Sequence, residues 1–374
     1  MKFTMKNTEA RKTVNIALIG CGFMGKEHAK AYALAPVSCP DIAATPVKKI
    51  LCDMMPGVAE TKAKLWDFEE FTTDYHEILN RDDIDIVDIC TPAPSHADIA
   101  IDFLKAGKFV FCEKPLTLSR EEGERLMAAV KEYHGRTAVG FNKRKWPAVE
   151  FAKQLVKEGV IGKVYLYNGR YHQDANDILT QRPAALNGGG FADSGSHILD
   201  MCRYILDDQY DSLVARAYQL EPDCGAKNDE ESFMLVTAQM KSGITASLYE
   251  TYAYSGTGED ISFEILGSKG SMRWSGANPS IFQLSIKDDD SRLNGHAFRN
   301  IILGPAHPRG NSVPPLPGFG VGVADNMAFE VCDIINAYCG GYEYNPSFAD
   351  AWDIIKLCDE IRVSEKTKQW VTCD

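Results

Sequence analysis

The chain has 374 residues, of which 45% are hydrophobic and 25% charged, and its formal net charge is −12 at pH 7. This length is sufficient for two domains that each bury a core. The excess of negative charge argues against a general nucleic-acid surface and against binding to anionic membranes. We therefore expect neither a nucleic-acid partner nor a membrane partner.

The eleven cysteines occur singly, and no C-x-x-C pair is present. Several of them, including Cys52 and Cys90, end apolar runs and have the character of small core residues. We expect free thiols in a reducing compartment, hence a cytoplasmic location, and no metal site. Residues 1–13 are polar and basic, and no later run approaches the roughly 18 apolar residues of a spanning helix.

A glycine motif follows the first apolar run of the chain. Residues 16–19 are apolar enough for a strand covered on both faces, and Gly20, Gly22 and Gly25 form G-x-G-x-x-G before a helical pattern. Gly20 permits the tight turn, Gly22 allows backbone to approach a pyrophosphate, and Gly25 lets the helix lie close to the strand. The helix N-terminus adds N–H groups and a positive dipole end. The motif predicts a dinucleotide site.

Short apolar runs alternate with amphipathic helical patterns up to about residue 145. The runs fall at 16–19, 47–52, 84–90, 109–112 and 137–140. This alternation is typical of a doubly wound parallel sheet of the Rossmann type. We therefore expect residues 1–145 to form a dinucleotide-binding domain.

Asp53 ends the second of these runs, where an acidic side chain can accept hydrogen bonds from an adenosine ribose and repel a 2′-phosphate. It lies later after Gly25 than the usual spacing, because the 36–46 stretch inserts a loop. Met54, Met55 and Pro56 follow it, with no basic residue or serine, so NAD is favoured over NADP. Asp53 could alternatively be only a cap for the next helix.

The pattern changes after residue 145. A strand is expected over 162–173, and two hairpins over 233–252 and 261–274, which together favour an antiparallel sheet with one exposed or interfacial face. Long loops are expected over 275–320, and two helices close the chain. Residues 146–374 are therefore expected to form an α+β domain with a large, open, mainly antiparallel sheet. This domain would bind substrate and assemble with further copies, and its last helices could pack back on the first domain.

Two groups of polar residues could carry chemistry. Lys114, in Cys112-Glu113-Lys114-Pro115, follows a strand of the first domain and would point toward the ligand crevice, although a lysine there could also be a loop residue. Asp193 and His197 are four residues apart and would share one helix face after a glycine-rich entry. Such a pair could bind a sugar hydroxyl and move its proton, could be structural, or could hold a metal, but no third ligand is visible.

The GCGFMG loop, Thr91-Pro92 with His96, the CEKP tetrapeptide and D-x-x-x-H-x-x-D together resemble the Gfo/Idh/MocA oxidoreductases. That family includes glucose–fructose oxidoreductase and inositol dehydrogenase, and the resemblance covers nearly the whole chain. Within the family, residues 140–148 and 171–174 favour the levoglucosan and glycoside dehydrogenase branch. The segment after Asp174 departs from that branch, because the expected tryptophans are missing from residues 175–178.

The resemblance implies a role for each motif residue. Lys114 matches the catalytic base, and Asp193 and His197 match the residues that bind the reacting carbinol and complete proton transfer. The proline of the EKP motif, here Pro115, commonly follows a cis peptide bond in the family. The positions expected to contact the cofactor are Gly20, Gly22, Phe23, Met24, Gly25, Asp53, Thr91, Pro92, His96, Glu113 and Lys114. The positions expected to contact substrate are Arg144, His172, Gln173 and Asp174, although His172 could simply lie in the sheet and His96 could only cap a helix.

These expectations combine into one activity: NAD-dependent hydride transfer from a secondary alcohol of a cyclic polyol, sugar or glycoside. Two alternatives remain at this point. One is a redox-neutral conversion in which NAD(H) stays bound, and the other is a non-catalytic dinucleotide sensor. The family also implies a homo-oligomer, a dimer or a tetramer. Substrate identity is expected to depend on the loops at 172–186 and 275–320.

Overall fold

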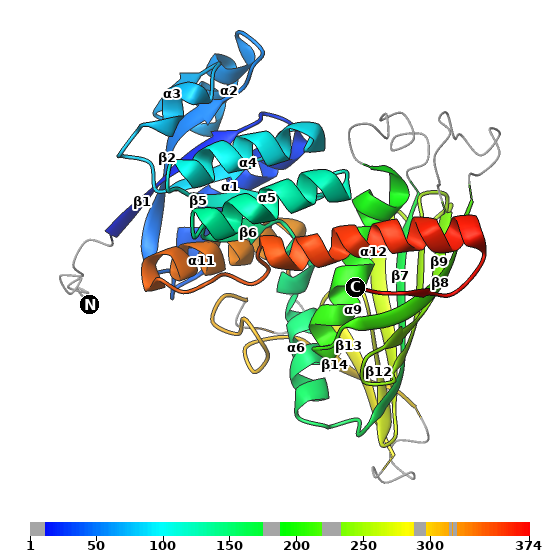
Figure 1. Ribbon diagram of the computed structural model, residues 1–374. Coiled ribbons are helices and arrows are strands. Elements are labelled where there is room, and N and C mark those ends of the chain that lie inside the picture. Colours follow the sequence, from blue (N-terminus) through cyan, green and yellow to red (C-terminus); the bar gives the residue numbers. More distant parts are fainter. Residues whose placement is uncertain (1–11, 175–187, 219–232, 288–296, 314–315, 317–319) are drawn as a thin grey trace, which may run out of the picture.

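The computed structural model describes residues 12–174, 188–218, 233–287, 297–313, 316 and 320–374, and Figure 1 shows its ribbon. Two β-sheets organise the molecule, one of six strands and one of nine. The elements around the first sheet are β1 (Lys12–Ile19), α1 (Phe23–Ser38), β2 (Ala44–Cys52), α2 (Val58–Trp66), β3 (Glu70–Thr72), α3 (His76–Leu79), β4 (Ile86–Ile89), η1 (Ala93–Ser95), α4 (His96–Lys105), β5 (Phe109–Cys112), α5 (Arg120–Glu132), β6 (Thr137–Val139) and η2 (Asn142–Lys145).

The first sheet has the strand order β3-β2-β1-β4-β5-β6, and all its described pairings are parallel. Strands β4, β5 and β6 are buried on both faces. Val87 and Val110 share a core cluster with residues of α4 and α5, whereas Ile86 and Phe109 share another with residues of α1 and α11. A strand covered on both faces must be apolar throughout, which explains the continuous apolar runs in the sequence. The expected Rossmann fold is confirmed.

The second sheet is mainly antiparallel, in the order β14-β13-β12-β11-β7-β10-β9-β8-β15, with β7 and β10 parallel. One face packs against α6 and α9, and no helix of the described residues covers the other, which we call the open face. The remaining elements are α6 (Pro147–Lys157), β7 (Val164–Gln173), η3 (Phe191–Gly195), α9 (Ser196–Leu206), β8 (Tyr210–Tyr218), β9 (Phe233–Met240), β10 (Thr245–Thr251), β11 (Glu259–Gly267), β12 (Gly270–Ser275), β13 (Ile281–Ile286), β14 (Arg299–Ile302), α11 (Val323–Gly340), α12 (Phe348–Thr367) and β15 (Val371–Thr372).

Both expected hairpins form, as β9–β10 and β11–β12. The stretch 275–320 is not only loop, because β13 and β14 extend the sheet within it. These two strands are short and end next to Gly-, Pro- and Asn-rich segments, and those breaker residues hid them in the sequence.

The two closing helices connect the two sheets. Met327 and Val331 of α11 pack in the cluster that contains Tyr32 of α1, under the first sheet. In Figure 1, α12 begins beside α5 and β6 and extends across to β8. Helix α12 thus links β8, near one edge of the second sheet, to α5 and to β6 of the first sheet.

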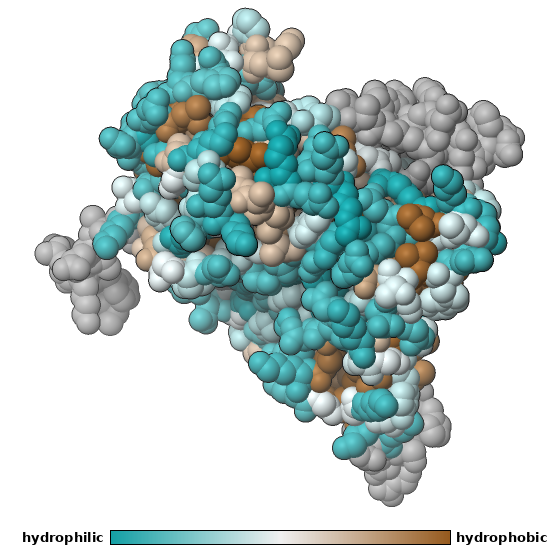
Figure 2. All heavy atoms as spheres, in the orientation of Figure 1, coloured by the Kyte–Doolittle hydropathy of each residue, from teal (hydrophilic) through white to brown (hydrophobic). Residues whose placement is uncertain are grey.

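The face that carries α4, α5 and α12 is predominantly hydrophilic in Figure 2, with hydrophobic atoms in small separate groups. Among the helices of the described residues, none combines the length and the apolar character needed to cross a membrane.

Candidate active site

The glycine loop between β1 and α1 has the shape expected for a dinucleotide. Gly20 has φ +103°, and a Cβ atom there would lie 2.6 Å from the carbonyl oxygen of Cys90. A Cβ on Gly25 would meet the Gly20 carbonyl oxygen at 2.0 Å, so only glycine allows this approach of helix to strand. A Cβ on Gly22, the N-cap of α1, would meet no atom within 4 Å. The uncapped N–H groups of α1 and the open space beside Gly22 fit a pyrophosphate.

Asp53 lies at the end of β2, opposite this loop. Its carboxylate accepts hydrogen bonds from the backbone N–H groups of Cys21 at 2.9 Å and of Met55 at 2.9 Å. The side chain thus joins the glycine loop to the turn after β2 and is more than a helix cap. Phe23 is exposed at the start of α1, whereas Met24 is partly buried against the core.

The segment after β4 connects the glycine loop to Lys114. The hydroxyl of Ser95 donates to the Thr91 hydroxyl at 2.7 Å, and the backbone of Thr91 lies beside Gly20. The ring of His96 is buried between the carbonyl oxygens of Thr91 at 2.7 Å and Pro115 at 2.9 Å. His96 therefore holds the two loops together and does not present a free nitrogen to a ligand.

Lys114 and Asp193 are 79 residues apart in sequence but adjacent in space. The Nζ atom of Lys114 lies 2.5 Å from a carboxylate oxygen of Asp193 and 3.0 Å from its carbonyl oxygen. The hydroxyl of Tyr252 donates to the other carboxylate oxygen at 3.4 Å. The Lys114–Pro115 peptide bond is cis, as the family resemblance implied. The loop after β5 and the entry to α9 thus converge on one ion pair.

Residues Phe191–Gly195 form a π-helical turn before α9, a wider turn than the α-helix expected from the spacing of Asp193 and His197. His197 lies in the first turn of α9 between the rings of Phe141, 6.0 Å away, and Tyr171, 6.1 Å away. Its Nδ1 atom is buried and has no hydrogen-bond partner among the residues that the structure describes. Burial, with the positive charges of Lys114 and Lys143 nearby, lowers the pKa of His197 well below its usual value. The imidazole is therefore neutral and can accept a proton.

Glu113 does not point toward a cofactor. One carboxylate oxygen accepts the backbone N–H of Lys114 at 3.0 Å, and the other lies 3.0 Å from Nε2 of His28. Nδ1 of His28 in turn lies 2.8 Å from Asp88, and all three side chains are buried. Burial opposes protonation of His28, but Asp88 and Cys90 together outweigh it and raise the pKa of the ring. Glu113 therefore fixes the backbone at Lys114 from beneath.

Lys143 and Glu259 were not predicted as site residues, yet the structure places them beside His197. Nζ of Lys143 lies 2.6 Å from Oε1 of Glu259 and 5.6 Å from the centre of the Tyr171 ring. The Tyr171 hydroxyl donates to the same oxygen at 2.8 Å. The sequence carried one signal for Lys143, its position in the 140–148 motif. Glu259 carried none, because it reaches the site only through the pairing of β11 with β7.

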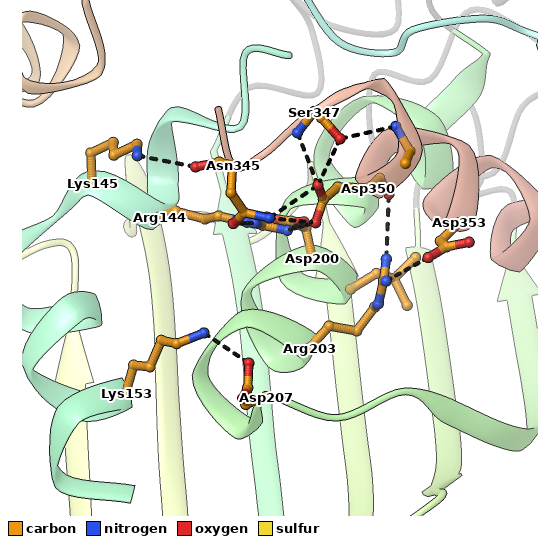
Figure 3. Close-up of polar contacts among 12 residues, drawn as sticks. Arg144, Lys145, Lys153, Asp200, Arg203, Asp207, Asn345, Ser347, Asp350 and Asp353 are labelled. Carbon is orange, nitrogen blue, oxygen red and sulfur yellow. Dashed lines mark hydrogen bonds and ion pairs between the residues drawn. The ribbon is translucent and has the colours of Figure 1, made fainter. Parts of the chain in front are cut away.

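Arg144, expected to bind substrate, lies instead in a buried ionic network, shown in Figure 3. Its guanidinium contacts both carboxylate oxygens of Asp200, at 2.7 and 2.5 Å, and also reaches Asp350 at 3.1 Å and Asn345 at 2.6 Å. With its donors engaged and only 4% of the side chain exposed, Arg144 joins η2 to α9 and α12. The second acidic residue of D-x-x-x-H-x-x-D is thus structural: Asp200 holds α9 about one turn beyond His197.

The last three residues expected to contact substrate are consecutive, at the end of β7 and directly after it, but their side chains point to different places. Gln173 faces the site, since its amide oxygen accepts the hydroxyl of Ser194 at 2.8 Å. His172 points to the open face of the sheet, where its ring stacks on Tyr254 at 4.3 Å, because successive side chains of a strand alternate between faces. Asp174 accepts the backbone N–H of Gly256 at 2.8 Å and so fixes the β10–β11 connection. The loop after it, 175–187, lies outside the described residues.

One group of described residues has metal-ligand spacing, namely His28, Asp88 and Cys90. All three are buried, and the Cys90 thiol lies 3.3 Å from Nδ1 of His28, so the hydrogen bonds of the group already account for its polar atoms. The group is linked to the backbone of Lys114 through Glu113, which contacts His28.

A glycine loop for a dinucleotide, connected through His96 to a lysine, a carboxylate and a neutral imidazole, defines a dinucleotide-dependent oxidoreductase. Residues 14–141 match the model of an oxidoreductase family with an NAD-binding Rossmann fold, and residues 149–273 match the GFO/IDH/MocA C-terminal domain. The chain belongs to this Gfo/Idh/MocA family of oxidoreductases, and the family expected from the motifs is confirmed.

Similar proteins cover almost the whole chain. Levoglucosan dehydrogenase from Pseudarthrobacter phenanthrenivorans is 32% identical over 96% of this chain and 98% of its own length. An inositol 2-dehydrogenase from Rhizobium meliloti is 31% identical over 76% of this chain and 83% of its own length. A structure of levoglucosan dehydrogenase in complex with NADH and levoglucosan matches with a TM-score of 0.92 and 32% identity, covering 97% of this chain and 100% of that one.

Proposed function

We propose that this protein is an NAD-dependent dehydrogenase that oxidises a secondary alcohol of a cyclic polyol, sugar or glycoside. The observation that carries the proposal is that Lys114, Asp193 and the neutral His197 lie close together. The loop that carries Lys114 is connected through His96 to the segment beside the glycine loop. The similar dehydrogenases for levoglucosan and inositol support the class of substrate. The functional division proposed is residues 1–145 for the cofactor and 146–374 for substrate and assembly.

The glycine loop and Asp53 would hold the dinucleotide, which when bound supplies the hydride acceptor. The residues of the chain provide orientation and proton transfer. The Lys114 ammonium, held by Asp193, would donate a hydrogen bond to the alcohol oxygen and stabilise the negative charge that develops there. His197 would take the hydroxyl proton, because its ring is neutral before the reaction and so has one unprotonated nitrogen.

The direct test replaces Lys114 by methionine and follows NADH absorbance with levoglucosan, L-sorbose and inositols as substrates. We expect kcat to fall by roughly 10²- to 10⁴-fold while the affinity for NAD, from NADH fluorescence, stays the same. Lys153→Met is the matched control, because Lys153 also pairs with a carboxylate, Asp207, but lies outside the site. Turnover retained in the Lys114 variant contradicts the assignment. Turnover by the wild type without added NAD would favour the redox-neutral cycle instead.

We also propose that the open face of the second sheet is covered by another copy of the chain in a cytoplasmic homo-oligomer. Leu235 and Tyr254 are exposed there, beside a hollow of about 540 Å³ that His172 and Arg170 line. Burying such apolar side chains against a partner removes them from water. Light scattering on the purified protein tests this, and a monomer would contradict it.

A further inference from the structure

The Lys143–Glu259 pair retains hydrogen-bonding capacity beside the proposed proton acceptor. Among the described residues, the contacts of Lys143 use one of its three Nζ donors, the bond to Oε1 of Glu259. The Tyr171 hydroxyl donates to that same oxygen, which leaves Oε2 of Glu259 without a partner in the described part of the chain. The pair therefore offers both donors and an acceptor.

The position of the pair is set by three elements that meet at His197. Lys143 comes from η2, directly after the first sheet, Glu259 opens β11, and Tyr171 lies on β7 with its ring in edge contact with His197. The positive charge of Lys143 is close enough to His197 to help lower the pKa of that ring, and Lys114 similarly acts on Glu259. The Lys143–Glu259 and Lys114–Asp193 pairs thus both lie beside the same imidazole.

A purely structural role explains this arrangement poorly. Glu259 is about half exposed, at 49%, and an exposed ion pair contributes only about 0–1 kcal/mol to stability. Arg144, the next residue, shows the contrast, because its side chain is 4% exposed and fully engaged by carboxylates. Lys143 keeps 13% of its side chain exposed and holds its charge at the surface of the site.

A hydroxyl group of a sugar or polyol ring both donates and accepts a hydrogen bond, and an ammonium next to a carboxylate satisfies both requirements. We propose that Lys143 and Glu259 bind a second hydroxyl of the substrate ring, beside the carbinol on which Lys114 and His197 act. The pair thereby selects polyhydroxylated rings over simple cyclic alcohols. This inference rests on the proposed dehydrogenase function. It assigns residues to a second hydroxyl of the substrate, which Lys114 and His197 do not bind.

The test compares wild type, Lys143→Met and Glu259→Gln on one substrate and on its monodeoxy analogues. The substrate is the best of levoglucosan and the inositols, and each analogue lacks one ring hydroxyl. On the parent compound, we expect both variants to lose roughly 10- to 100-fold in kcat/KM, mainly through a raised KM, with the affinity for NAD unchanged. On one analogue, the one without the recognised hydroxyl, wild type and variants should perform alike.

Lys153→Met is the control for removal of a lysine from an ion pair next to a tyrosine, since Lys153 pairs with Asp207 and lies 4.3 Å from the Tyr204 ring centre. It should leave kcat/KM unchanged. An equal loss by the Lys143 variant on the parent and on every analogue overturns the inference, as does an unchanged kcat/KM. If Lys114→Met is inactive while Lys143→Met is not impaired, only this inference fails. If wild type oxidises none of the compounds, the proposed function fails and this inference with it.

Discussion

Arg144 provides a sharp test of the difference between a substrate contact and a framework residue. Its guanidinium makes a bidentate contact with Asp200, and both side chains are nearly inaccessible to water. Burial raises the pKa of Asp200, and the nearby Arg144 opposes that rise and favours the charged carboxylate. Replacing Arg144 by methionine keeps much of the aliphatic volume but removes this compensation.

The expected loss follows from the burial of the pair. Breaking a buried ion pair from one side leaves an uncompensated charge and costs about 3–5 kcal/mol. Asp350 and Asn345 also lose a donor in this variant. In Arg144→Met/Asp200→Asn the stranded charge is gone, so the double variant should lose less than the sum of the two single variants.

Urea unfolding followed by circular dichroism measures the loss, and Lys153→Met again serves as the control. That exposed pair should change stability by less than about 1 kcal/mol. We also expect the Arg144 variant to turn over more slowly, because Asp200 lies on the helix that carries His197. A variant with unchanged stability and a raised KM for substrate would refute the framework role and restore Arg144 as a binding residue.

Two further predictions concern a buried carboxyl group and the choice of cofactor. Glu330 of α11 is buried without a hydrogen-bond partner among the described residues, and burial, with Glu113 nearby, raises its pKa from 4.5 to about 8. The folded state therefore keeps a proton that the unfolded chain releases above about pH 4.5, and stability falls as pH rises toward 8. Glu330→Gln should be more stable than wild type by roughly 3 kcal/mol at about pH 7 and by less than about 1 kcal/mol at about pH 5. Urea unfolding at the two pH values measures this, and a stability difference that does not change with pH would contradict it. Replacing Asp53 by serine removes the carboxylate that repels a 2′-phosphate. The ratio of kcat/KM with NADP to kcat/KM with NAD should therefore rise at least about tenfold. An unchanged ratio would mean that Asp53 has a purely structural role.

Residues of the glycine loop and of the strand patterns were predictable because their physical causes are local. Gly20 and Gly25 are required where backbone atoms approach within a few ångströms, and a doubly covered strand must be apolar along its whole length. The same holds for the hairpins β9–β10 and β11–β12, whose turns and alternation lie within a short window. Strands β13 and β14 were not predicted, because short strands among breaker residues are stabilised by pairing with neighbouring strands and lack a clear hydrophobic pattern of their own.

The candidate site shows the same division. Motif spacing and family resemblance selected Lys114, Asp193 and His197, and the structure brings their elements together. Which way a neighbouring side chain points depended on packing partners far away in sequence. His172 turned to the open face of its strand, and Glu113 turned inward to His28.

The sequence by itself determined the family, the two sheet types and the dinucleotide loop, and it selected the residues proposed to act on the substrate. Only the tertiary structure decided that Arg144 supports α9 while the adjacent Lys143 faces the site with Glu259, 116 residues away. The two basic residues are equivalent in local pattern, and their roles differ because one is enclosed by the carboxylates of α9 and α12 and the other is not. Burial and charge pairing depend on the whole fold, which no local window of sequence contains.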